Sequence, residues 1–199
     1  FNPTFPVFQG FRLTHQPSPW MGDFCSIVMT PITGQPNGVS LDTLRSSYHR
    51  ETAVFKPNRV SLTSQQYQLN TTIVPTKRAG QIVIKQQNNQ SLGLVLSSDQ
   101  AMTVERGLSP HHLLVTIKQP VRDGASTLTF YIQYVFDAPV SLLSYQEDTW
   151  QSVDTTTIGP VWVQIANEKN EATISFGTSF IMKNLRKGNR YIGICITNE

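Results

Sequence analysis

The chain contains stretches in which apolar and polar residues alternate with a period of two. The clearest one covers residues 126–136, and its apolar side chains stand at every second position: Leu128, Phe130, Ile132, Tyr134 and Phe136. Because successive side chains of a strand point to opposite faces of a sheet, this pattern predicts a strand with one face buried. We therefore expect an all-β fold, a two-sheet antiparallel sandwich of jelly-roll type.

Further apolar stretches recur along the chain, separated by the Gly, Pro, Asn and Asp residues that are typical of turns. They predict strands at residues 24–30, 54–62, 67–74, 81–85, 92–96, 113–117, 161–165, 172–176 and 190–197. Pro57 weakens the second of these, since a proline cannot donate to a central ladder. With no internal repeat and no linker, the strands predict a single sandwich domain over residues 20–199.

One short helix is expected near residues 41–48. Ser40 is a suitable N-cap, and Leu41, Leu44 and Tyr48 share one face at helical spacing. This segment therefore interrupts the strands once, early in the chain.

Residues 1–19 are predicted to form an extended N-terminal arm. The arm opens with the apolar, proline-rich sequence FNPTFPVF. An apolar segment of this kind needs a surface to cover it, either on its own domain or on a neighbouring subunit. The candidate contact residues of the arm are Phe1, Phe5, Val7 and Phe8.

Charged residues are scarce. They make up 15% of the chain, against about 25% in a typical soluble protein, and Ser, Thr, Gln and Asn replace them. A neutral polar surface suits contacts with other proteins, because charges are depleted from interface cores. The alternative is that a β-rich protein simply favours Thr and Ser.

The charges that are present are segregated along the chain. Residues 43–98 hold seven Lys and Arg against one Glu, a net charge of +6, whereas residues 123–168 hold six acidic residues and no basic one. Either these are solvated loops, or surfaces of opposite charge let identical subunits meet. A further basic block lies in a predicted turn, and its residues are candidates to face nucleic-acid phosphates: Lys183, Arg186, Lys187 and Arg190.

No pattern of residues indicates catalysis or metal binding. The histidines have no metal-ligand spacing to one another, to a cysteine or to a carboxylate: His15, His49, His111 and His112. No nucleophile elbow, phosphate-binding glycine loop or zinc-protease pattern is present, and the acidic loop at residues 137–154 matches no defined calcium loop. We therefore expect no enzyme, no catalytic residue, no metal and no cofactor.

Two further observations concern the cysteines and the membrane. Cys25 and Cys195 lie near opposite ends of the chain, and free buried thiols are favoured over a bridge because two cysteines are few for a secreted domain. No apolar run approaches the roughly 20 residues that span a bilayer, so no membrane contact is expected.

Trp150 lies in the acidic loop and is a candidate to face a receptor or a glycan. Aromatic rings that combine an apolar body with a polar tip are common on such surfaces. The competing interpretation is a tryptophan half-buried between the sheets.

Several of these features together resemble the jelly-roll coat proteins of small icosahedral, picorna-like viruses. They are the start at Phe1 without an initiator Met, the FNPTFPVF arm, the short helix, the long strand at residues 126–141 and the charge-poor surface. The resemblance implies a structural coat subunit that self-assembles into an icosahedral shell, in a virion assembled in the host cytoplasm. The implied partners are copies of the chain, other coat subunits, viral genomic nucleic acid and a host receptor. The basic arm of many such proteins is missing, so contact with the genome would require either an upstream segment that has been removed or the turn at residues 183–190 in its place.

The alternative function is a receptor- or glycan-binding β-sandwich, such as a viral spike domain or a lectin-like module. Trp150 is the side chain that this alternative would use. The two hypotheses differ in assembly, because a binding module stays small whereas a coat subunit forms shells.

Overall fold

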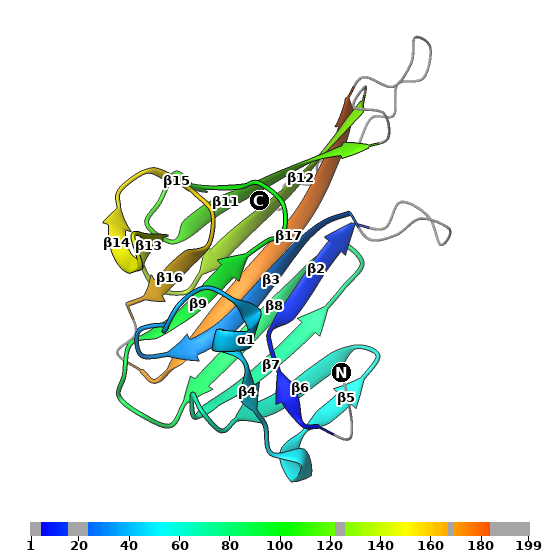
Figure 1. Ribbon diagram of the computed structural model, residues 1–199. Coiled ribbons are helices and arrows are strands. Elements are labelled where there is room, and N and C mark those ends of the chain that lie inside the picture. The colour runs from blue at the N-terminus through cyan, green and yellow to red at the C-terminus, as the bar shows by residue number, and fades with distance from the viewer. Residues whose placement is uncertain (1–4, 16–23, 122–125, 167–168, 184–199) are drawn as a thin grey trace.

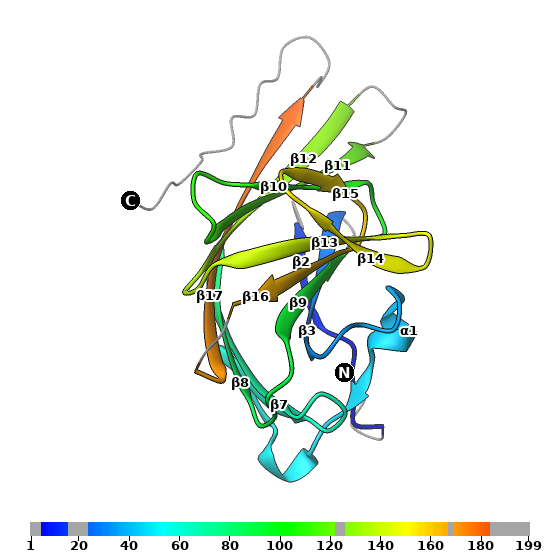
Figure 2. The same ribbon diagram turned by 90° about the vertical axis from the view of Figure 1, so that its left-hand side faces the viewer.

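The computed structural model describes residues 5–15, 24–121, 126–166 and 169–183. Within them the chain folds as an antiparallel β-sandwich of two large layers with one short α-helix (Figure 1). Figure 2 shows the layers from the side, with β8 and β17 in one and β9 and β16 in the other. The prediction of an all-β, two-sheet sandwich is confirmed.

One layer is a nine-stranded sheet, here called the large sheet. Its strands are, in spatial order, β15 (Thr156–Ile158), β10 (Met102–Arg106), β11 (His112–Val121), β12 (Ser126–Phe136), β17 (Glu171–Lys183), β8 (Ala79–Gln86), β7 (Leu69–Pro75), β6 (Arg59–Ser64) and β5 (Val54–Lys56). Strands distant in sequence are therefore neighbours at its centre, where β17 lies between β12 and β8.

The other layer has six strands and is called the small sheet. Its strands are, in spatial order, β14 (Thr149–Val153), β13 (Val140–Gln146), β16 (Val161–Ile165), β9 (Leu92–Ser97), β3 (Phe24–Thr33) and β2 (Phe11–His15). A separate pair joins β1 (Val7–Phe8) to β4 (Ser46–Ser47).

The core lies between the two sheets. Ile132 and Tyr134 of β12 are fully buried from one side, and Leu94 of β9 and Val163 of β16 are fully buried from the other. Burial of an apolar side chain of this size stabilises the fold by about 1.5–3 kcal/mol. The apolar residues that alternate in residues 126–136 thus lie on the inner face of one central strand, and the residues between them lie on its outer face.

The outer face of the small sheet is covered as well. Thr30 of β3 donates its hydroxyl to the carbonyl of Gln9 at 2.7 Å, and the indole N–H of Trp150 donates to the carbonyl of Pro36 at 2.8 Å. Segments before β2 and after β3 therefore cross this face, and Trp162 beneath them is 4% exposed.

The helix is shorter than expected. Helix α1 covers Leu41–Leu44, and the Ser40 hydroxyl accepts from the N–H of Thr43, as an N-cap should. It ends before residue 48 because Ser46–Ser47 form β4 with β1, and the Tyr67 hydroxyl donates to the Leu44 carbonyl.

Several strand predictions differ from the structure. The stretch at residues 54–62 is two strands, β5 and β6, since Lys56 pairs with Arg59 and Pro57 stands in the turn between them. Strands β10, β13, β14 and β15 were not expected, and β17 continues past residue 176 to Lys183. The strand expected at residues 190–197 lies outside the described residues.

The N-terminal segment is partly joined to the sandwich. Strand β2 pairs with β3 at the edge of the small sheet, with Phe11 opposite Met29. The boundary predicted at residue 19 lies outside the described residues, so the division into arm and sandwich stays a prediction. Among the described segments, no helix has the length and apolar character needed to cross a membrane.

Candidate functional site

A groove of about 500 Å³ lies on the large sheet, over strands β7, β8, β17 and β12. Its lining is Val74, Thr76, Ala79, Gly80, Gln81, Gln133, Val135, Ser175, Phe176 and Gly177. None of these side chains carries a charge, so the groove is neutral and mixes apolar with hydrogen-bonding groups.

Strand register aligns the exposed side chains of the groove. Val74 of β7 pairs with Gln81 of β8, Gln81 pairs with Ser175 of β17, and Ser175 pairs with Val135 of β12. Paired residues point to the same face of a sheet. The result is one row of four exposed side chains that crosses four strands.

A second row runs beside the first. Ala79 of β8 pairs with Gly177 of β17, and Gly177 pairs with Gln133 of β12. A Cβ built on Gly177 would meet no atom within 4 Å, so the space above this backbone is open. The middle of the groove is therefore hollow because a glycine stands where the neighbouring strands carry side chains.

The polar side chains of the groove are available to a ligand. Gln81, Gln133 and Ser175 are exposed, and none of them makes a side-chain hydrogen bond to another residue in the described part of the chain. Thr76 differs, since its hydroxyl donates to the Ala79 carbonyl at 2.8 Å and accepts from the Ala79 N–H. The groove thus offers two free amides and one free hydroxyl, which suits a neutral polar ligand.

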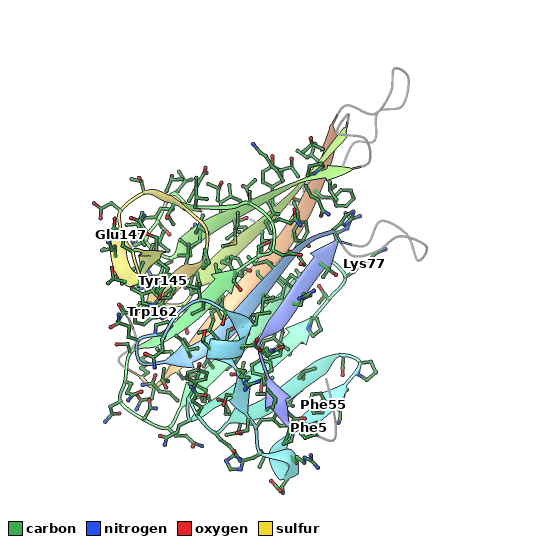
Figure 3. The ribbon with its side chains drawn as sticks, in the orientation of Figure 1. Phe5, Phe55, Lys77, Tyr145, Glu147 and Trp162 are labelled. Carbon is green, nitrogen blue, oxygen red and sulfur yellow. The ribbon has the colours of Figure 1, made fainter. Side chains whose placement is uncertain are left out.

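Two cations stand on the turn beside the groove and outside its lining. Lys77 and Arg78 are exposed on the turn between β7 and β8, and Figure 3 labels Lys77 there. Thr178 holds this turn by donating its N–H and its hydroxyl to the Arg78 carbonyl, at 2.8 and 3.0 Å. The two positive charges border the lining without entering it.

A smaller hollow of about 240 Å³ lies on the outer side of the small sheet and contains two charged residues, Arg12 and Asp99. The Ser26 hydroxyl donates to Asp99 at 3.1 Å, and the Ser98 hydroxyl donates to the Ser26 carbonyl at 2.7 Å. Asp99, Ser26 and Ser98 are therefore bound to one another, and this hollow has about half the volume of the groove.

Burial shifts the pKa of ionisable groups in the core and at its edge. The Tyr134 hydroxyl is fully buried, and burial raises the pKa of Tyr134 well above its ordinary value. The ring of His15 lies 3.8 Å from the ring of Phe180, and burial lowers the pKa of His15. In the described residues no group of three or more His, Cys, Asp and Glu is placed to hold a metal ion.

The predicted arm residues lie at one end of the molecule. Phe5 is 66% exposed, Val7 is exposed, and Phe8 packs its ring edge against Phe11 at 4.9 Å; Phe1 lies outside the described residues. Figure 3 shows Phe5 at the same end as Phe55. Contacts of this arm with another chain stay a prediction.

Trp150 is half-buried rather than free in a loop. It belongs to β14, its ring lies 5.1 Å from Tyr145 and 6.0 Å from Trp162, and its N–H is bound to Pro36. Figure 3 labels Tyr145, Trp162 and Glu147 in this region. Its glycan-facing role stays a prediction.

Most of the predicted basic turn lies outside the described residues. Lys183 is the last residue of β17, whereas Arg186, Lys187 and Arg190 lie outside the described residues. Cys195 lies outside them too, and the backbone of Cys25 belongs to β3. The turn formed by these basic residues and the state of the cysteines therefore stay predictions.

The groove residues were not singled out from the sequence. The alternation at residues 126–136 assigns Gln133 to the outer face, and this is the one indication of the groove that the sequence offers. Its neighbours Gly177 and Gln81 come from strands that are distant in the chain, so the groove could not be assembled without the strand order.

Comparison with known proteins gives a family. Residues 1–179 match the model of the glycosyl hydrolase family 92 N-terminal domain. No protein among the curated sequences matches the chain. The family match covers most of the chain and includes all the lining residues of the groove, the last of which in sequence is Gly177.

Solved structures share the fold. One is the family GH92 inverting mannosidase of Bacteroides thetaiotaomicron, with a TM-score of 0.72 and 20% identity over 88% of this chain and 24% of that one. A GH92 alpha-mannosidase of the same organism, in complex with mannoimidazole, has a TM-score of 0.69 and 14% identity over 90% of this chain and 26% of that one. A further GH92 glycosyl hydrolase has a TM-score of 0.60 and 11% identity, over 77% and 23%. The chain spans about a quarter of the length of these enzymes.

These findings overturn the coat-protein interpretation. The matching family and structures are glycosyl hydrolases, so the predicted capsid function, virion location and coat-subunit or genome partners are wrong. The prediction of no enzyme is wrong too, because the family is a domain of enzymes. The physical reason is that alternating apolar residues indicate a strand with one buried face, and that unrelated β-sandwiches share this pattern together with a low content of charged residues. The alternative hypothesis, a glycan-binding β-sandwich, agrees better with these findings than the coat-protein hypothesis does.

Proposed function

Because the chain belongs to the family of glycosyl hydrolase family 92 N-terminal domains, we propose that it forms the β-sandwich part of a glycosidase that hydrolyses α-mannosides. The observation that carries the proposal is the family match over residues 1–179. The fold shared with solved structures of mannosidases supports the choice of substrate.

The proposal assigns hydrolysis to the whole protein rather than to the sandwich alone. An inverting glycosidase needs two carboxyl groups about 6.5–9.5 Å apart, one as acid and one as base. The groove is lined by no carboxyl group, and Asp99 is the one carboxyl of the smaller hollow. Since the chain spans about a quarter of the related enzymes, the carboxyl pair is proposed to come from the remaining part of the protein.

Two other carboxylates of the sandwich bind groups on neighbouring strands. Asp137 accepts the N–H of Thr173 at 2.8 Å, which ties the start of β17 to the end of β12. Glu171 pairs with Lys85 at 3.0 Å across β17 and β8, on the exposed surface. The contribution of the sandwich is therefore proposed to be a rigid support and a neutral surface beside the substrate.

The test is an assay of the full-length protein encoded by the gene. Purified protein is incubated with an α-linked mannobiose and with an aryl α-mannoside, with an aryl β-mannoside and an aryl α-glucoside as controls. We expect mannose from the α-mannosides alone, and proton NMR of the first product should show the inverted anomer. Release of another sugar, or of none from any α-mannoside, contradicts the proposal.

A further inference from the structure

We propose that the groove on the large sheet is a subsite for an uncharged oligosaccharide, separate from the place of hydrolysis. The choice of an α-mannoside chain as ligand rests on the proposed function, whereas the site itself rests on the geometry of β7, β8, β17 and β12. Four observations carry it: the free amides, the apolar ends, the neutral lining and the hollow at Gly177.

The free amides match the hydrogen-bonding groups of a sugar. Each glutamine side chain both donates and accepts, and each sugar hydroxyl also does both. Gln81 and Gln133 stand on either side of β17 in neighbouring rows, Gln81 opposite Ser175 and Gln133 opposite Gly177. Their bonding capacity is unused within the described residues, so a ligand satisfies these groups without breaking the fold.

The spacing of the strands indicates the length of the ligand. Strands β8 and β12 are separated by two inter-strand distances, about 10 Å in total. Gln133 also stands two residues along β12 from Val135, the residue in the row of Gln81, so the two amides are offset along the strands as well. This favours an oligosaccharide over a monosaccharide.

The apolar ends of the row complete the match. Val74 is 41% exposed and Val135 is 37% exposed, at the two ends of the row that Gln81 and Ser175 connect. Sugar rings carry apolar C–H faces between their hydroxyl groups. Covering these valines removes apolar surface from water, which favours binding.

The neutral lining argues against other occupants. An anionic ligand finds no cation among the lining residues, because Lys77 and Arg78 stand on the turn beside the groove. A cationic ligand finds no carboxylate there either. An uncharged glycan needs neither.

Gly177 allows the groove to be filled without disturbing the sandwich. A side chain at this position meets no atom within 4 Å of its Cβ, and it points into the hollow between Ala79 and Gln133. Gly177→Trp is therefore a blocking variant. Ile158→Trp, on the edge strand β15 at an exposed position outside the lining, is its matched control.

The experiment uses the full-length protein and two readouts. Affinity electrophoresis in α-mannan measures binding, and kcat/KM on α-mannan and on an aryl α-mannoside measures hydrolysis. Gly177→Trp should weaken retention by α-mannan at least about tenfold and lower hydrolysis of α-mannan more than that of the aryl α-mannoside. Gln81→Ala and Gln133→Ala should each weaken retention about fivefold, and Ile158→Trp should match the parent protein.

Three results overturn the proposal. The first is unchanged retention of Gly177→Trp by α-mannan. The second is an equal loss on polymer and aryl substrate, which places the groove in the hydrolytic site. The third is a loss of folding stability of Gly177→Trp with binding intact, which shows that another part of the protein occupies the groove.

Failure of the proposed function is distinguishable. If the full-length protein hydrolyses no α-mannoside, retention is measured on α-mannan, xylan, β-glucan and galactan. Retention by any of these neutral glycans that Gly177→Trp abolishes supports the subsite, and the absence of retention by all of them overturns it.

Discussion

The ring of Phe176 in β17 occupies the space beside Gly80 in β8, its partner across the strand pair. A Cβ on Gly80 would collide with the end of this ring and would lie 3.0 Å from the Val74 carbonyl oxygen. Phe176 is 5% exposed, so the ring has little room to move away. Gly177, one residue further along β17, has the opposite environment.

This contrast predicts opposite effects of the same substitution. Gly80→Ala should lower the free energy of unfolding by about 1–3 kcal/mol, because the ring and the strand must shift. Gly177→Ala, the matched control, should leave it unchanged or raise it by up to about 1 kcal/mol, because alanine restricts the unfolded chain. Urea titration followed by tryptophan fluorescence measures both. Equal effects of the two variants would show that the ring of Phe176 does not occupy this space.

The hydroxyl of Tyr134 gives a second prediction. The residue is fully buried, and its oxygen has no hydrogen-bond partner in the described part of the chain. A buried polar group without a partner costs about 1–3 kcal/mol. Tyr134→Phe should therefore leave the free energy of unfolding unchanged or raise it by about 1 kcal/mol. A loss above about 1 kcal/mol would indicate a partner such as a buried water.

Part of this architecture follows from sequence pattern. The alternation at residues 126–136 and the apolar run at residues 161–165 match the bounds of β12 and β16, because both strands bury one continuous apolar face. Pro57 does not suit a central ladder, and it stands in the turn beside the edge strand β5.

Other elements carry too little pattern to be predicted. Strand β14 is mostly exposed and β15 has three residues, so neither shows a clear apolar period. The groove depends on the order β8, β17, β12, which joins residues nearly 100 positions apart, as the Thr178–Arg78 hydrogen bond illustrates. Pairing over such distances in sequence is decided by packing of the whole sandwich, which local periodicity does not report.

His15 gives a prediction on pH. Its ring is packed against Phe180, its Nε2 is buried without a hydrogen-bond partner among the described residues, and burial lowers the pKa of His15 below the ordinary value of about 6.5. The unfolded chain therefore binds a proton at His15 at a higher pH than the folded chain does. The contribution of His15 to the stability of the fold is fully present above about pH 6.5, where the ring is neutral in both states. That stability is lost as the pH falls from about 6.5 toward the lower pKa of the folded state.

His15→Phe keeps the ring stacking and removes the titration. The free energy of unfolding of the parent protein should decrease more steeply between pH 7 and pH 5 than that of the variant. Urea titrations at several pH values measure the two slopes, and His49→Phe, at an exposed position, serves as the control. Identical slopes for the parent and His15→Phe would contradict the assignment.

Trp150 gives the last prediction, which decides between its two interpretations. Its N–H donates to the Pro36 carbonyl at 2.8 Å, and its ring packs edge-on against Trp162. These contacts tie the segment after β3 to β14. If this is the role of Trp150, Trp150→Phe should lower the free energy of unfolding by about 1 kcal/mol, because the hydrogen bond to Pro36 is lost. Retention of the variant by α-mannan should then match that of the parent protein. A variant that keeps its stability and loses glycan retention would instead establish the ring as part of a sugar-binding surface.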